Sequence, residues 1–129
     1  MGMIKVNLSS KEKRLEDEFP LDRDFGIYAL LSNIHHIREM RFSRGDLDAS
    51  ILLLDFEDSM NKTNLTLRQQ QTIYLFFEKD LTQQEVAEIL QISQQAVSEH
   101  LNNAIRRIAQ YNMEREEEFY DSVHGKVSA

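Results

Sequence analysis

The chain has 129 residues, 41% of them hydrophobic, and a formal net charge of −7 at pH 7, which suits one small domain and excludes several full-sized ones. It contains no cysteine, which excludes disulfides and thiolate metal sites and favours a reducing, cytoplasmic location. No apolar run is long enough to span a bilayer and the N-terminus lacks a signal-peptide layout, so we expect a soluble, non-exported protein with no membrane partner.

The scarcity of turn-forming residues, four glycines and one proline, predicts an all-α fold. We interpret residues 1–24 as an N-terminal arm. Its first apolar residues alternate with polar ones, as in an extended segment. Ser9 and Glu12 then have capping-box spacing, which predicts one or two helical turns before Pro20.

Residues 25–62 are predicted to form a helical hairpin used for self-association or partner binding. Apolar side chains recur every three or four residues from Phe25, which predicts a helix over about 25–43 that ends before Gly45. Asp46 or Asp48 begins the second helix. The dense aliphatic content of this helix predicts burial on more than one side, including the side chains of Leu47, Ile51 and Leu54.

Three helix starts follow in quick succession. Thr66 with Gln69 and Thr82 with Glu85 form capping boxes, and Ser93 is placed to cap a third helix. The helix over 83–90 is expected to bury Val86, Ala87, Ile89 and Leu90, and the next to bury Val97, Leu101, Ala104, Ile105 and Ile108. Because only residues 91–93 separate these two helices, they must turn sharply, as in a helix-turn-helix.

Residues 65–108 contain three short motifs: Leu65, Arg68 and Gln69, a Glu-Val-Ala-x-x-Leu helix at 85–90, and an Ile-Ser-x-x-x-Val start at 92–97. With these motifs the segment resembles region 4 of bacterial sigma factors. The resemblance implies a helix-turn-helix DNA-binding domain over 65–110. The Ser-Gln-Gln-Ala-Val-Ser opening at 93–98 is most similar to small sigma-like regulators of phages and prophages.

The sequence departs from the family at two points. The turn has Gln91 where the family commonly has glycine. Either Gln91 adopts a positive φ at a cost of roughly 1 kcal/mol, which the helix caps recover, or the turn differs slightly from that of the family. The N-terminal part is too short and too acidic for the aromatic, basic region with which a complete sigma factor melts its promoter. We therefore do not expect a stand-alone sigma factor.

The start of the second helix of a helix-turn-helix enters the major groove, whereas the first helix crosses the DNA backbone. Base contacts are therefore expected from Gln94, Gln95, Ser98, Glu99 and Asn102. Phosphate contacts are expected from Arg68, Thr82, Gln83, Gln84, Ser93, Arg106 and Arg107. The simpler alternative is that the glutamines are merely good exposed helix formers.

Residues 65–108 carry four basic and five acidic side chains, so this segment alone should hold DNA weakly. A homodimer or a DNA-bound partner such as RNA polymerase would supply the missing affinity. The function predicted is a sequence-specific DNA-binding transcription regulator that acts with or on RNA polymerase. The alternative is a protein-binding adaptor or antagonist that uses the sigma-like segment to bind polymerase or another regulator.

The remaining patterns predict little chemistry. No phosphate loop, nucleophile motif or ligand cluster is present, so we expect no enzyme, no cofactor, no metal and no small-molecule substrate. His35 and His36 point to different sides of their helix and are interpreted as a solvated or partly packed pair. Residues 111–129 form an acidic C-terminal tail, either a solvated extension of the last helix or an acidic arm for a basic partner surface.

Overall fold

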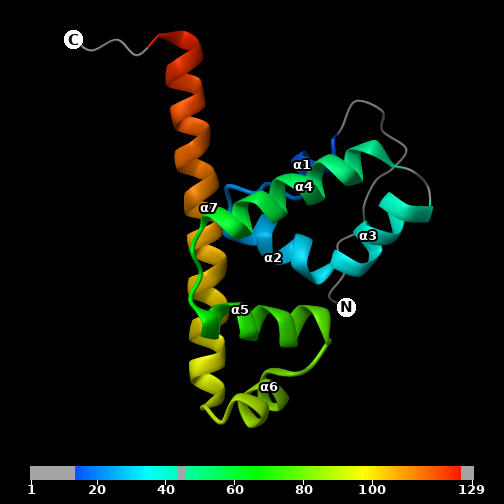
Figure 1. Ribbon diagram of the computed structural model, residues 1–129, viewed down its shortest axis with the longest axis vertical. Helices are drawn as coiled ribbons and strands as arrows, with labels where there is room; N and C mark the ends of the chain where they lie inside the picture. Colours follow the sequence, from blue (N-terminus) through cyan, green and yellow to red (C-terminus); the bar gives the residue numbers. More distant parts are fainter. Residues whose placement is uncertain (1–13, 44–45, 126–129) are drawn as a thin grey trace.

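The computed structural model describes residues 14–43 and 46–125, and within these ranges every regular element is helical, which confirms the predicted all-α class. The Ser9 cap and the alternating start of the arm lie outside the described residues. In chain order (Figure 1) the elements are α1 (Leu15–Glu18), α2 (Asp24–Ser32), α3 (Ile34–Ser43), α4 (Leu47–Lys62), α5 (Leu67–Ile73), the π-helix η1 (Tyr74–Glu78), α6 (Gln83–Leu90) and α7 (Gln94–His124).

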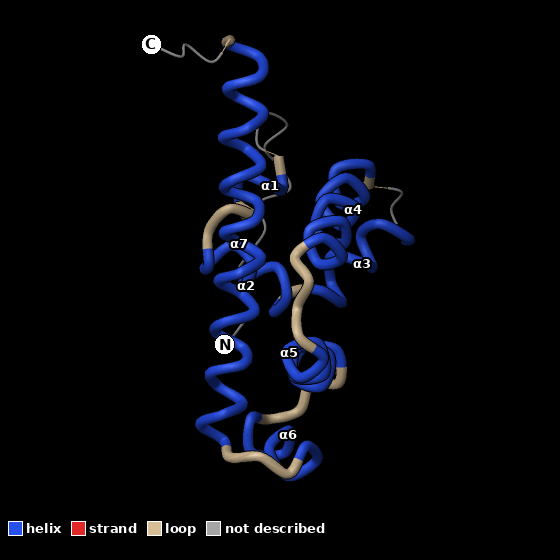
Figure 2. The backbone as a smooth tube through the Cα atoms, turned by 60° about the vertical axis from the view of Figure 1, so that its left-hand side comes forward, coloured by secondary structure: helices blue, strands red, loops and turns tan. Residues whose placement is uncertain are grey.

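Helix α7 is the spine of the molecule. It has 31 residues and runs the full height of the view in Figure 1, with α5 and α6 beside its first half and α2 and α4 beside its middle. Figure 2 shows the same arrangement after rotation. The last helix therefore continues well past residue 110, to His124, so the acidic tail is largely helical.

The helix predicted over 25–43 is instead two helices, α2 and α3, which meet at Asn33. Asn33 leaves the helical region (φ −113°, ψ 16°), and its side-chain Nδ2 donates to the Ala29 carbonyl at 2.7 Å. An asparagine side chain competes in this way with the helical backbone for the same acceptor. Because the apolar side chains Leu31 and Ile34 are buried on both sides of the break, hydrophobic periodicity did not reveal it.

Helix α4 starts where the sequence predicts, because the Asp46 side chain accepts a hydrogen bond from the Ala49 amide at 3.1 Å. The predicted burial on several sides is wrong. Leu47, Ile51 and Leu54 are 72%, 40% and 53% exposed and form one stripe along the helix. The helix is contacted by α1, α3 and α7, which bury its other apolar side chains, Ala49, Leu52, Leu53 and Phe56.

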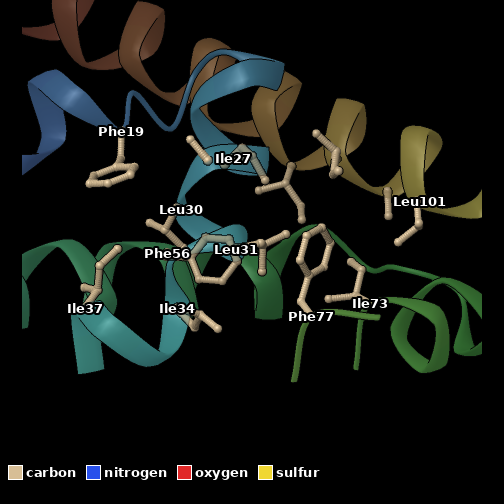
Figure 3. Packing of buried hydrophobic residues seen from close by; sticks show 14 of the residues in the cluster. Phe19, Ile27, Leu30, Leu31, Ile34, Ile37, Phe56, Ile73, Phe77 and Leu101 are labelled. Carbon is tan, nitrogen blue, oxygen red and sulfur yellow. The ribbon is translucent and has the colours of Figure 1, made fainter. Parts of the chain in front are cut away.

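One continuous apolar core joins the N-terminal helices to the segment that resembles region 4. Figure 3 shows Leu30 and Leu31 of α2 beside Phe56 of α4, with Phe77 of η1 and Ile73 of α5 completing the cluster. Leu101 of α7 closes the other end. The helices of residues 24–62 are therefore packed onto the helix-turn-helix and help to hold it in place.

Candidate nucleic-acid interface

The helix-turn-helix is built from two capped helix starts. The Thr82 hydroxyl accepts from the Glu85 amide at 3.1 Å, and the Glu85 carboxylate accepts from the Thr82 amide at 3.0 Å. The Ser93 hydroxyl accepts from the Ala96 amide at 3.0 Å. Both helices therefore begin at the predicted residues. Each capping hydroxyl still has its own hydrogen, which it can donate to a phosphate oxygen.

The turn between α6 and α7 is a Schellman motif. Gln91 adopts the left-handed conformation, the first of the two alternatives expected from the sequence (φ 57°, ψ 45°). The Ile92 amide donates to the Ala87 carbonyl at 3.1 Å and the Gln91 amide to the Glu88 carbonyl at 3.4 Å, the two bonds of that motif. These hydrogen bonds hold the turn even though glycine is absent.

The apolar face of the helix-turn-helix is largely as predicted. Val86, Ala87, Val97, Leu101, Ala104, Ile105 and Ile108 are buried. Leu90 is half-buried, and Ile89, which was expected inside, is 57% exposed. The eight-residue α6 turns only one side toward α7 and η1, so an apolar residue next to that side remains in solvent.

Four side chains of α7 form an exposed row that we call the reading stripe: Gln95, Glu99, Asn102 and Arg106. Their spacing of four, three and four residues places them on one face of the helix. Gln94 is exposed at the tip of the helix, and Ser98 is half-buried at the edge of the stripe. The predicted base-contacting residues are thus gathered on one accessible surface, apart from the core face.

The two arginines near the middle of α7 have different environments. Arg106 belongs to the reading stripe, is exposed, and donates to Asn103 Oδ1 at 3.1 Å. Arg107 lies about 100° further around the helix. Its guanidinium donates to the carbonyls of Thr63 and Asn64 and to Gln69 Oε1, each at 3.2 Å. Arg107 therefore fastens α7 to the loop before α5.

The other predicted phosphate contacts lie on α5 and α6. Arg68 is exposed and donates to Gln71 Oε1 at 3.3 Å. Gln84 is exposed and Gln83 half-buried, both in the first turn of α6. The side-chain amides of Gln83 and Gln84 can donate hydrogen bonds to phosphate oxygens next to the Thr82 cap.

A second group of residues lies beside the reading stripe. A hollow of about 200 Å³ between α2 and α7 is lined by Asp24, Phe25, Tyr28, Asn102, Ile105 and Arg106. Phe25 and Tyr28 are 65% and 48% exposed. Sequence reasoning missed this neighbourhood because the α2 residues are more than 70 positions from Asn102 and meet it only through tertiary packing.

The described residues include no group of three or more histidine, cysteine, aspartate or glutamate side chains placed to hold a metal ion. His35 Nε2 lies 3.8 Å from Asp80 Oδ2, so its neighbour is a surface carboxylate after η1. Within the same part of the chain, no helix combines the length and apolar character that crossing a bilayer requires.

Comparison with known families agrees with this geometry. Residues 63–110 match the family model described as Sigma-70, region 4. The match spans α5, η1, α6 and the first half of α7 and confirms the resemblance predicted from the sequence. Searches of curated proteins and of solved structures give no match to the chain. The matched segment is therefore similar to sigma region 4 and has the geometry of a helix-turn-helix.

Proposed function

We propose that this chain is a sequence-specific DNA-binding transcription regulator that acts with or on RNA polymerase in the cytoplasm. The observation that carries the proposal is the reading stripe, four exposed polar side chains on the second helix of a region 4-like helix-turn-helix. A helix in this position presents its first turns to the major groove. We extend the proposal to a phage or prophage origin, on the similarity of residues 93–98 to such regulators.

Each residue at this surface has a chemical role in the proposal. Gln94 and Gln95 carry amides that can bond N6 and N7 of adenine, and the Glu99 carboxylate can accept from cytosine N4. Ser98 and Asn102 extend the same surface by one turn. Arg68, Arg106, the hydroxyls of Thr82 and Ser93, and the amides of Gln83 and Gln84 contact phosphates. Arg107, which is bonded to the loop before α5, acts chiefly by holding α7 in position.

The near-neutral charge of residues 65–108 limits how tightly this segment alone can bind DNA. With four basic and five acidic side chains over 65–108, electrostatic attraction to DNA is weak, so a second binding contribution is needed. We propose a homodimer, formed through the exposed stripe of Leu47, Ile51 and Leu54 on α4, or a joint complex with RNA polymerase. Both the α4 stripe and the reading stripe are accessible in a single protomer.

Selection of bound sites from random duplex DNA tests the proposal, done at 50 mM salt with and without bacterial RNA polymerase. A defined site should emerge. Gln95→Ala should then relax the preference at one base pair by about 1–3 kcal/mol without loss of stability. Gln110→Ala is the matched control, because Gln110 is exposed on the same helix about 22 Å along the axis from Gln95, one turn beyond Arg106, and bonds only Glu114 among the described residues, at 2.9 Å.

The adaptor remains the second candidate because the chain is acidic overall and the DNA-facing segment has a slight excess of acid. Such a charge suppresses stray DNA contacts and suits a protein-binding role. Failure to bind any duplex at low salt, alone and with polymerase, while polymerase is still bound in the absence of DNA, would replace the regulator with the adaptor.

A further inference from the structure

The last three turns of α7 project beyond the rest of the molecule, at the end opposite the helix-turn-helix (Figure 1). From residue 114 to 125 every residue except Asp121 is exposed. Isolated helical segments of this length are marginal in water, and most helical stability in proteins comes from packing an amphipathic face. The projecting turns have an amphipathic face, and little of the same chain packs against it.

We call this surface the C-terminal face and define it as Met113, Glu116, Phe119, Tyr120 and Val123. These five positions fall within an arc of about 120° on the helix. Phe119, Tyr120 and Val123 are 69%, 62% and 60% exposed. The other sides of the same turns carry Glu114, Arg115, Glu117, Glu118 and Asp121. The apolar strip thus has Glu116 within it, Glu117 beside one edge and Arg115 beside the other.

Two adjoining hollows flank the C-terminal face and share Asp22, Glu116 and Phe119. The larger, about 730 Å³, lies between α1, α4 and α7, and five of its lining residues are acidic: Glu16, Asp17, Asp22, Asp55 and Glu116. The smaller, about 530 Å³, is lined by the apolar side chains of Met113, Phe119, Tyr120 and Val123 together with Arg23, Glu117 and His124. Together they form a groove in which apolar side chains lie beside a cluster of carboxylates.

The six carboxylates of this groove outnumber its two arginines, Arg23 and Arg115. The pKa of Glu16 is raised to about 7 by a hydrogen bond shared with Asp55 and by burial. Burial and the neighbouring Asp22 raise the pKa of Glu116. The Arg115 guanidinium in the same groove pairs with Asp58 at 2.9 Å. A cationic side chain entering the groove would therefore relieve repulsion among these acids.

We propose that the C-terminal face binds a basic amphipathic helix of a partner protein, with its apolar side on Phe119, Tyr120 and Val123 and its lysine or arginine side chains among the surrounding carboxylates. A second copy of the chain is the wrong occupant, because residues 113–124 carry five acids and one base and like charges would face each other. The same sign repels DNA and anionic membranes. Phe119 lies about 36 Å along α7 from Gln95, so the partner binds clear of the reading stripe.

The test uses the full-length chain and a synthetic 15-residue helical peptide of lysine and leucine, with leucine at positions i, i+3, i+4 and i+7. Binding followed by fluorescence anisotropy at 50 mM salt should be saturable, and Phe119→Ser combined with Val123→Ser should weaken it at least tenfold. Glu116→Lys, which keeps the apolar strip, should also weaken it at least tenfold. Leu67→Ser is the matched control, because Leu67 is 70% exposed on α5 and should leave binding unchanged.

Two further peptides separate the apolar and electrostatic contributions. A glutamate–leucine peptide with the same spacing should not bind, and a lysine–serine peptide of the same charge should bind at least tenfold more weakly. Equal binding of the lysine–serine peptide, or no effect of the Phe119 and Val123 substitutions, overturns the proposal. Sedimentation that shows a wild-type dimer, converted to monomer by those substitutions, overturns it in favour of a second copy.

Discussion

The Arg38 guanidinium and the Glu78 carboxylate form a two-pronged ion pair, with Nη1 to Oε2 and Nη2 to Oε1 both at 2.7 Å. The pair joins α3 to η1 across 40 positions of sequence. Arg38 lowers the pKa of Glu78 by hydrogen bonding and charge, and the same contact raises the pKa of Arg38. This ion pair therefore links the N-terminal helices to the region 4-like segment.

Replacement of this pair should show a measurable coupling. Arg38 and Glu78 are 40% and 28% exposed, so solvent screens the attraction, and a double-mutant cycle of Arg38→Ala and Glu78→Ala should give about 1 kcal/mol at pH 7. The stabilisation exists above the unfolded-state pKa of glutamate and disappears as the pH falls through the lowered folded-state pKa. Urea unfolding at pH 7 and pH 3 measures both.

The pair between Lys62 and Asp58, four residues apart on the surface of α4 at 3.2 Å, provides the comparison. Its cycle should give about 0.3–0.5 kcal/mol. Equal coupling for the two pairs would show that the contact between α3 and η1 has no special role in holding the two parts together.

Glu16 should make stability fall as the pH rises. Its folded-state pKa of about 7 exceeds the ordinary value of 4.5, so the folded chain binds more protons than the unfolded chain between these pH values. Stability is therefore lost from about pH 4.5 to pH 7 and then levels off. Because Glu16 is only partly buried, solvent reduces the effect, and Glu16→Gln should stabilise the protein by about 1 kcal/mol at pH 8.

The measurement is the difference in unfolding free energy between Glu16→Gln and the parent chain as a function of pH. Other titrating groups cancel in this difference. It should be near zero at pH 4 and grow toward pH 8.

Gln91→Gly should stabilise the turn by about 1 kcal/mol, because glycine adopts a φ of 57° without the cost borne by other residues. Introducing glycine three residues earlier should instead lower the free energy of unfolding. Glu88→Gly lies inside α6, where glycine costs about 1 kcal/mol. Thermal or urea unfolding of the two variants gives the comparison, and destabilisation by both would mean that the Gln91 side chain has a role beyond its backbone conformation.

Arg106→Ala and Arg107→Ala should separate DNA contact from support. Arg106→Ala should weaken binding to all sequences and reduce the salt slope by about one unit, with little change in stability. Arg107→Ala removes three hydrogen bonds to Thr63, Asn64 and Gln69 and should cost about 1–3 kcal/mol of stability. Salt-dependent DNA titrations and urea unfolding of both variants test this, and a reversal of the two phenotypes would contradict the assignment.

Local sequence patterns predicted the conformation correctly wherever a short segment determines its own structure. The caps at Thr66, Thr82 and Ser93 were predicted from residue type, and that of α4 was narrowed to Asp46 or Asp48, because a capping hydrogen bond spans only three residues. The inward face of α7 likewise follows from helical periodicity, whereas the positive φ of Gln91 was expected from the glycine common at this position in the family it resembles.

Only the tertiary structure decided which faces meet another element. Leu47, Ile51 and Leu54 have the spacing of a buried stripe, yet they face solvent because the elements packed on α4 cover its other sides. Arg106 and Arg107 are adjacent and chemically identical, but the loop before α5 accepts hydrogen bonds from the second alone. Composition and periodicity determined that this chain forms helices, and capping residues determined where α5, α6 and α7 begin. Long-range packing, which no local pattern encodes, determined which side chains remain available for a partner.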